Sequence, residues 1–173
     1  RIAAVESYAR AQVGQQVRQL EQQLLEATSS DGDWSTALFA DPRTLLRPLA
    51  ATGAVLWHEG RCRTCGEVPS EDALAGLRNF LAEHSTDAEP WHCVSLASEL
   101  PDLASLSGTA SGVLAVRLAS SPDSHLVWLR PAAGPMLPDT ALPWTGNELD
   151  LASALGRGGA FEAGEGRVGL LHV

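Results

Sequence analysis

Two short apolar runs in the second half of the chain constrain its fold more than any other feature. Val113 to Ala119 and Leu126 to Leu129 are almost continuously apolar, and a polar linker of residues 120–124 joins them. A strand with one face in water alternates apolar and polar side chains, and these runs do not alternate. We therefore predict two central strands that are covered on both faces and joined by an antiparallel connection.

A β-hairpin is predicted on the N-terminal side of these runs. Ala54 to His58 and Arg61 to Cys65 are strand-like segments, and Glu59-Gly60 between them has the composition of a two-residue turn. Such a turn places Trp57 opposite Cys62 on one side of the hairpin.

Helical segments are expected to flank the strands. Thr44 to Leu49 can form one or two helical turns after the start signal Asp41-Pro42, and Ser70 is predicted to cap a further helix. The buried stripe of that helix is predicted at Leu74, Leu77 and Leu81. Trp91 to Ser95 is predicted as a short additional strand.

The N-terminus is predicted to form a long amphipathic helix. Residues 2–27 contain no proline and a single glycine, and their apolar residues recur in steps of three and four. At about 1.5 Å per residue this helix would be about 40 Å long. Two interpretations stay open: it connects modules or pairs with a copy of itself, or it packs one face on its own domain.

The composition changes at Pro131. Four prolines fall within thirteen residues, and glycines then become frequent from Gly156 onward. An irregular stretch of this length exceeds an ordinary connection, so we predict an extended arm. The predicted domain organisation is therefore a connecting helix at 1–28, a core at 29–131 and an arm at 132–173.

Composition excludes several classes of function. The net charge is −9, all 12 basic residues are arginine, and the absence of lysine rules out a Walker A lysine or a Schiff-base lysine. The arginines are scattered among carboxylates, which argues against a nucleic-acid or membrane partner. The odd count of three cysteines suits reduced thiols in the cytoplasm. A start at Arg1 and an apolar end are expected of a segment cut from a longer protein.

The sequence contains only weak candidates for a metal, redox or catalytic site. Cys62 and Cys65 form a CxxC, and His92 with Cys93 could complete a zinc or redox site. In a regular strand, residues three apart point to opposite faces, so the two thiols of the CxxC would diverge. The histidines are dispersed, and neither a nucleophile elbow nor an HExxH motif occurs. We therefore predict no catalytic residue and no metal site.

Several segments resemble the PHY domain of bacterial phytochromes, a relative of the GAF fold. Gly53-Ala54-Val55-Leu56-Trp57-His58-Glu59-Gly60 and Thr64-Cys65-Gly66-Glu67-Val68-Pro69 are similar to that domain. Thr109-Ala110-Ser111-Gly112-Val113-Leu114-Ala115-Val116 resembles its "tASGlLAi" strand entry, and Val127-Trp128-Leu129-Arg130-Pro131 its "lWfRPE" sequence. The resemblance implies an α+β fold, with a GAF-like antiparallel sheet flanked by helices, a long N-terminal helix and an extended tongue-like arm.

The arm also resembles the tongue, the long hairpin with which PHY domains seal the bilin pocket of a neighbouring GAF domain. Trp144-Thr145-Gly146-Asn147 is similar to the family's "WxGxP" stretch. Gly156-Arg157-Gly158-Gly159-Ala160-Phe161 keeps the arginine and phenylalanine of "PRxSF" but spaces them one residue too far apart and lacks the proline and serine. The resemblance therefore implies that Trp144, Arg157 and Phe161 are tongue or pocket-sealing candidates.

The resemblance further implies a photosensory role for the whole protein. A biliverdin-type bilin is expected in an upstream GAF domain of the same polypeptide, and none is expected on this segment itself. Isomerisation of the bilin would be relayed to an output module such as a histidine kinase, within a homodimer formed through the long helices. The alternative is a GAF-like domain that binds its own small ligand or serves only for dimerisation.

Overall fold

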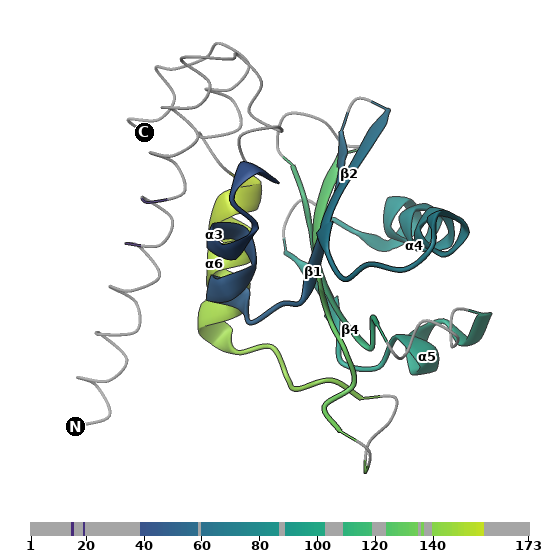
Figure 1. The fold of residues 1–173 in the computed structure, drawn as a ribbon. Helices are drawn as coiled ribbons and strands as arrows, with labels where there is room; N and C mark the ends of the chain where they lie inside the picture. Colours follow the sequence, from purple (N-terminus) through teal and green to yellow (C-terminus); the bar gives the residue numbers. More distant parts are fainter. Residues whose placement is uncertain are drawn as a thin grey trace.

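The fold is described from a computed structural model of the chain (Figure 1). Of the predicted N-terminal helix only Gln15 and Gln19 are described, and both are helical and exposed. Phe161 and the rest of the predicted arm beyond Arg157 lie outside the described residues. The described residues are 15, 19, 39–58, 60–86, 89–102, 109–118, 124–134, 136 and 140–157.

A five-stranded sheet forms the centre of the fold, and every pair of neighbouring strands is antiparallel. Its spatial order is β2-β1-β5-β4-β3. Sequence neighbours and long-range partners are therefore mixed, because β5 inserts between the first hairpin and β4. The strands are β1 (Gly53–His58), β2 (Arg61–Gly66), β3 (Trp91–Cys93), β4 (Gly112–Arg117) and β5 (His125–Arg130).

The prediction of two central strands is confirmed. All six residues of β5 are buried, and β4 is buried along its length except at Arg117, which is half-buried. The first hairpin also has the predicted register, with Trp57 opposite Cys62 and Val55 opposite Thr64. Gly60 lies in its turn with a φ of 75°, a left-handed conformation that glycine adopts without steric cost.

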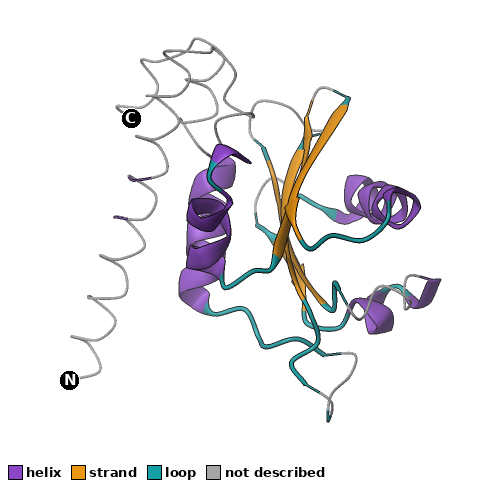
Figure 2. Ribbon diagram, in the orientation of Figure 1, coloured by secondary structure: helices purple, strands orange, loops and turns teal. Residues whose placement is uncertain are grey.

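Helices cover both faces of the sheet, so the fold has three layers (Figure 2). On one face lie α3 (Pro42–Leu46), the 3₁₀ turn η1 (Arg47–Leu49) and α6 (Gly146–Arg157). On the other face lie α4 (Glu71–His84) and α5 (Leu96–Glu99). The predicted fold class, an α+β domain with an antiparallel sheet flanked by helices, is confirmed.

Each face of the sheet has its own apolar core. On the α4 face the predicted stripe of that helix packs over alternate residues of the strands, and Trp57 lies there with Cys93. On the α6 face the largest fully buried side chain is that of Trp128, whose indole Nε1 donates to the Leu45 carbonyl at 3.1 Å. Because β5 contributes to both cores in alternation, it has no polar face, which explains its continuous apolar sequence.

The helix α4 begins as predicted. The Ser70 side chain accepts a hydrogen bond from the backbone nitrogen of Ala73 at 3.3 Å. Glu71 and Asp72 lie in the first turn, where carboxylates interact favourably with the helix dipole. Leu74, Leu77 and Leu81 are all buried.

The prediction of an irregular arm is wrong between Gly146 and Arg157, where the chain forms α6. Leu151, Ala152 and Leu155 of this helix belong to the core of the α6 face. A Cβ atom added to Gly156 would lie 3.0 Å from the Cβ of Val116 on β4, so this glycine permits close packing of helix on strand. The buried core therefore continues past residue 131. Among the described residues, no helix is sufficiently long and apolar to cross a membrane.

Candidate functional site

The C-terminal end of the connection from β5 to α6 is attached to the rest of the domain by hydrogen bonds and close packing. The Ala141 nitrogen donates to the Val94 carbonyl at 2.8 Å, and a Cβ atom on Gly112 would lie 2.8 Å from the Ala141 Cβ. The Ala133 nitrogen donates to the Thr140 carbonyl at 2.7 Å. We call residues 140–145 the strap, because they cross the end of the edge strand β3 before entering α6.

Arg130, the last residue of β5, is buried beneath the strap with 5% of its surface exposed. Its Nη1 donates to the carbonyls of Leu142 at 3.1 Å and Pro143 at 3.0 Å. Its Nη2 donates to the Leu49 carbonyl at 2.7 Å and to Oε2 of Glu148 at 2.6 Å. The single guanidinium therefore joins β5, the strap, η1 and α6, and we call this arrangement the Arg130 clamp.

Glu148 both neutralises the clamp and caps α6. Its Oε1 accepts a hydrogen bond from the Thr145 nitrogen at 2.8 Å, while the Thr145 hydroxyl accepts one from the Glu148 nitrogen at 3.2 Å. This reciprocal pair is a capping box, which fixes the first turn of a helix. The side chains of Arg130 and Glu148 are 6% and 14% exposed, so their charges are paired out of water.

Trp144 packs against the clamp. The Cζ atom of Arg130 lies 3.7 Å from the Trp144 ring centroid, the distance of a cation–π contact. The Trp144 indole Nε1 donates to the Cys93 carbonyl at 3.0 Å. Trp144 is 8% exposed and belongs to the core of the α6 face. These contacts attach the strap to the end of β3.

A cavity of about 410 Å³ opens beside the clamp. Arg130 and Glu148 are the charged side chains in its wall, and they neutralise each other. The remaining wall is mostly apolar and comes from the segment between η1 and β1 and from the connection on both sides of residues 134–139. Its residues are Ala50, Thr52, Pro131, Ala132, Ala133, Leu142, Pro143 and Thr145.

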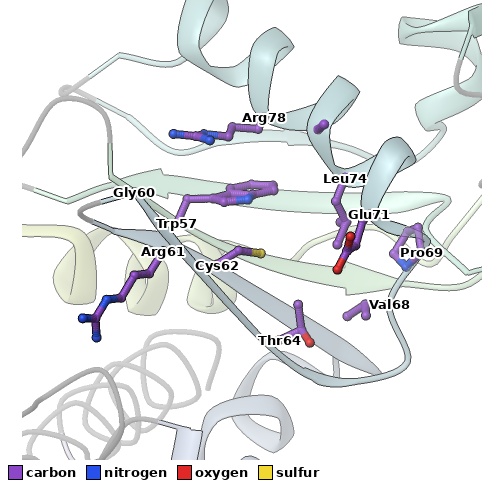
Figure 3. A pocket seen from close by; sticks show the side chains of 11 residues that line it. Trp57, Gly60, Arg61, Cys62, Thr64, Val68, Pro69, Glu71, Leu74 and Arg78 are labelled. Atoms are coloured by element: carbon purple, nitrogen blue, oxygen red, sulfur yellow. The ribbon is translucent and has the colours of Figure 1, made fainter.

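A second pocket, of about 340 Å³, lies between the hairpin and α4 (Figure 3). Trp57, Cys62 and Thr64 contribute from the hairpin, and Leu74 and Arg78 from the helix. Arg61 points away from the other labelled side chains (Figure 3). Burial raises the pKa of the Cys62 thiol and Arg78 opposes that rise, so a reactive thiolate is not favoured here.

The cysteines do not converge. Cys62 lines the pocket beside α4, whereas Cys65 packs against the core of the α6 face, as expected for strand residues three apart. Burial raises the pKa of the Cys93 thiol to about 12. Within the described part of the chain, no group of three or more His, Cys, Asp or Glu side chains could hold a metal ion.

Comparison with known proteins now identifies the family. The family described as the phytochrome region, PHY, matches residues 17–148, which is more than half of the chain. This chain belongs to the phytochrome-region family. The matched range includes all five strands, the strap, the clamp and the start of α6.

Two relatives show the extent of the similarity. Cyanobacterial phytochrome B from Nostoc sp. is 28% identical over 116 residues, which are 67% of this chain and 15% of that protein. A crystal structure of a bacteriophytochrome from the photosynthetic bacterium R. palustris has a TM-score of 0.72 at 19% identity, covering 99% of this chain and 39% of that one. The chain thus spans a minor part of these relatives, and the structural likeness concerns the fold.

The predicted site residues lie in different settings in this PHY domain. Trp144 is held in the strap by Arg130 and Cys93, Arg157 is the last residue of α6, and Phe161 lies outside the described residues. Their pocket-sealing role stays a prediction. The clamp formed by Arg130 and Glu148 was not predicted from the sequence, although the spacing Thr145-x-x-Glu148 is a capping-box signal that could have located the start of α6.

Proposed function

We propose that this PHY domain belongs to a bacterial phytochrome-like photosensory protein and relays bilin isomerisation to an output module such as a histidine kinase. The observation that carries the proposal is the family match over residues 17–148. In this proposal a biliverdin-type bilin is held by an adjacent, upstream GAF domain in the same polypeptide. The domain itself contributes binding contacts and movement, and no catalytic step.

The proposed assembly is a cytoplasmic homodimer that pairs through residues 1–28. The apolar residues that recur in steps of three and four along this segment support a helix that lies along a partner helix. The scattered arginines and the net charge of −9 favour neither nucleic acid nor a membrane as partner. Size-exclusion chromatography with light scattering would show a dimer for residues 1–173 and a monomer when residues 1–28 are removed.

The output of the domain is proposed to depend on differential contacts in two photostates. A ligand or light signal shifts a two-state equilibrium only by the difference in free energy of contacts between the states. Arg157 and Phe161 are proposed to contact the neighbouring domain, since both follow the buried part of α6. Trp144 is proposed to act indirectly, by holding the strap.

The decisive experiment uses the parent polypeptide expressed with biliverdin. A reversible absorbance change between red and far-red light is expected, and its absence overturns the photosensory proposal. In the same protein, Arg157→Ala is expected to shorten the lifetime of the light-induced state, because the bidentate contact proposed between its guanidinium and a carboxylate of the neighbouring GAF domain would be lost. Arg78→Ala, an exposed arginine on α4, is the matched control and should leave the lifetime unchanged.

A second candidate function is a GAF-like domain that binds its own small ligand. The pocket of about 340 Å³ between the hairpin and α4 favours it, because this volume suits a small organic molecule. The indole of Trp57 lines this pocket, so a bound ligand should change tryptophan fluorescence, and Trp57→Phe should remove that change. Saturable binding to residues 1–173 without bilin would support this candidate.

A further inference from the structure

The strap and α6 share one charged side chain. Nη1 of Arg130 binds two carbonyls of the strap, Leu142 and Pro143, while Nη2 binds Glu148 of α6. The guanidinium is planar, so its two ends cannot move independently. A displacement of the strap carbonyls would therefore change the direction in which Nη2 points toward Glu148.

Glu148 connects this movement to the start of the helix. One of its carboxylate oxygens binds Arg130 at 2.6 Å, and the other accepts from the nitrogen of Thr145, the last strap residue, at 2.8 Å. The Leu149 nitrogen then bonds the Thr145 carbonyl at 3.0 Å. The geometry of the first turn of α6 thus depends on the same carboxylate that holds the clamp.

The strap carries an exposed apolar side chain that another surface could contact, and it borders a cavity. Leu142 is 65% exposed although its carbonyl binds Arg130, and Met136 just before the strap is 90% exposed. They are the exposed large hydrophobic side chains of the described residues. The cavity of about 410 Å³ borders Leu142, Pro143 and the clamp, so part of the strap is not backed by packed atoms.

We infer that Arg130 couples the strap to the first turn of α6, so that a displacement of the strap alters the stability of that turn. Arg130 acts as a positioning residue, because it transmits a backbone movement from one element to the next through two sets of hydrogen bonds. The inference concerns the chain's own residues, so it holds whether or not the photosensory proposal is right.

The test compares two substitutions at the exposed strap residue in the full 173-residue chain. Leu142→Gly loosens the strap backbone, and Leu142→Ala removes the side chain without that loosening. The difference between glycine and alanine corresponds to about a two- to fivefold change in a local opening equilibrium. Amide exchange of Glu148 and Leu149, measured by NMR, is expected to be faster by about that factor in Leu142→Gly than in Leu142→Ala.

The coupling is then tested by weakening the clamp. With Arg130→Lys, which keeps the charge but loses the planar fork, the difference between the two Leu142 variants should disappear. With Arg117→Lys, a control at a half-buried arginine outside the clamp, it should persist. Within each background, amides of α4 should exchange alike in the two Leu142 variants, since a difference there would mean global destabilisation.

Three results overturn the inference: no difference between the Leu142 variants, a difference that survives Arg130→Lys, or equal acceleration in α4. Should Arg130→Lys fail to fold, Glu148→Gln takes its place, because it keeps the size of the side chain and removes the charge that holds Nη2. Disappearance of the difference in that background supports the coupling, and persistence overturns it.

Discussion

The ion pair between Arg130 and Glu148 makes a strong prediction for stability. The two side chains meet at 2.6 Å and are 6% and 14% exposed, so the pair resembles a buried rather than a surface salt bridge. Surface pairs contribute about 0–1 kcal/mol, whereas removing one partner of a buried pair costs about 3–5 kcal/mol, because the remaining charge stays buried without compensation. Glu148→Gln, which preserves the shape of the side chain, is therefore expected to destabilise the fold.

The expected loss follows from what glutamine can still do. Glu148 uses one oxygen for Arg130 and the other for the Thr145 nitrogen, and both neighbours are donors. A glutamine has one acceptor oxygen, so its amide nitrogen would face one of the two donors. Arg130 keeps the carbonyls of Leu49, Leu142 and Pro143, which places the loss near the lower end of the range, at about 3 kcal/mol.

Urea denaturation followed by tryptophan fluorescence measures this loss. At an m-value of about 2 kcal/mol/M, the midpoint should fall by about 1.5 M urea. Glu83→Gln, at an exposed position of α4, is the matched control and should change the free energy of unfolding by less than about 0.5 kcal/mol. Equal effects of the two substitutions would refute the reasoning, because the clamp would then behave as a solvated surface pair.

The remaining predictions concern packing and thiols. Gly156→Ala should lower the free energy of unfolding by about 1 kcal/mol or more in the same assay, because its methyl group would lie 3.0 Å from the Cβ of Val116 on β4. At Gly146 an added methyl group meets nothing within 4 Å, so Gly146→Ala should not lower it. Iodoacetamide should modify the exposed Cys62 well before the buried Cys93, as mass spectrometry would show; the reverse order would contradict the placement of the two strands. The raised pKa of Cys93, about 12 against an ordinary 9.0, favours the neutral thiol in the fold. The contribution of the Cys93 thiol to stability should therefore be fully present below pH 9 and be lost by up to about 1.4 kcal/mol per pH unit between pH 9 and about 12. Cys93→Ala should reduce that slope in alkaline urea titrations.

The central strands and the register of the first hairpin could be predicted because their signals are local in the sequence. The runs that form β4 and β5 lack alternation, and a strand that contributes to both cores needs no polar face. The turn at Gly60 fixes the register of the hairpin, since a two-residue loop leaves one pairing between Trp57 and Cys62. Both features depend on residues within a few positions of each other.

Helix α6 was missed because glycine and proline were counted as breakers without regard to position. Pro143 precedes the helix, Gly146 is its first residue, and Gly156 lies where the helix closely approaches β4. This proline and these glycines therefore mark the start of a helix or a place where it packs closely on a strand. The capping box formed by Thr145 and Glu148 was the local signal of a helix start.

The burial of Arg130 could not be predicted, because arginine is rarely buried unless it is paired. Its partners come from η1, the strap and α6, and the Leu49 carbonyl is 81 positions away in the sequence. No periodicity indicates such a convergence, since each partner is a backbone carbonyl or a carboxylate with an ordinary local role. The clamp becomes visible only when the sheet has brought these elements together.

The strap has two structural roles that depend on the same short segment. It donates hydrogen bonds to the carbonyls of Cys93 and Val94 at the end of the edge strand β3, where unpaired groups would otherwise face outward. It also supplies Thr145, the cap of α6. Because edge strand, clamp and helix start all depend on residues 140–145, a force applied at the exposed Leu142 would reach α6 without crossing the sheet. The packed β5 could not provide such a path without disrupting both cores.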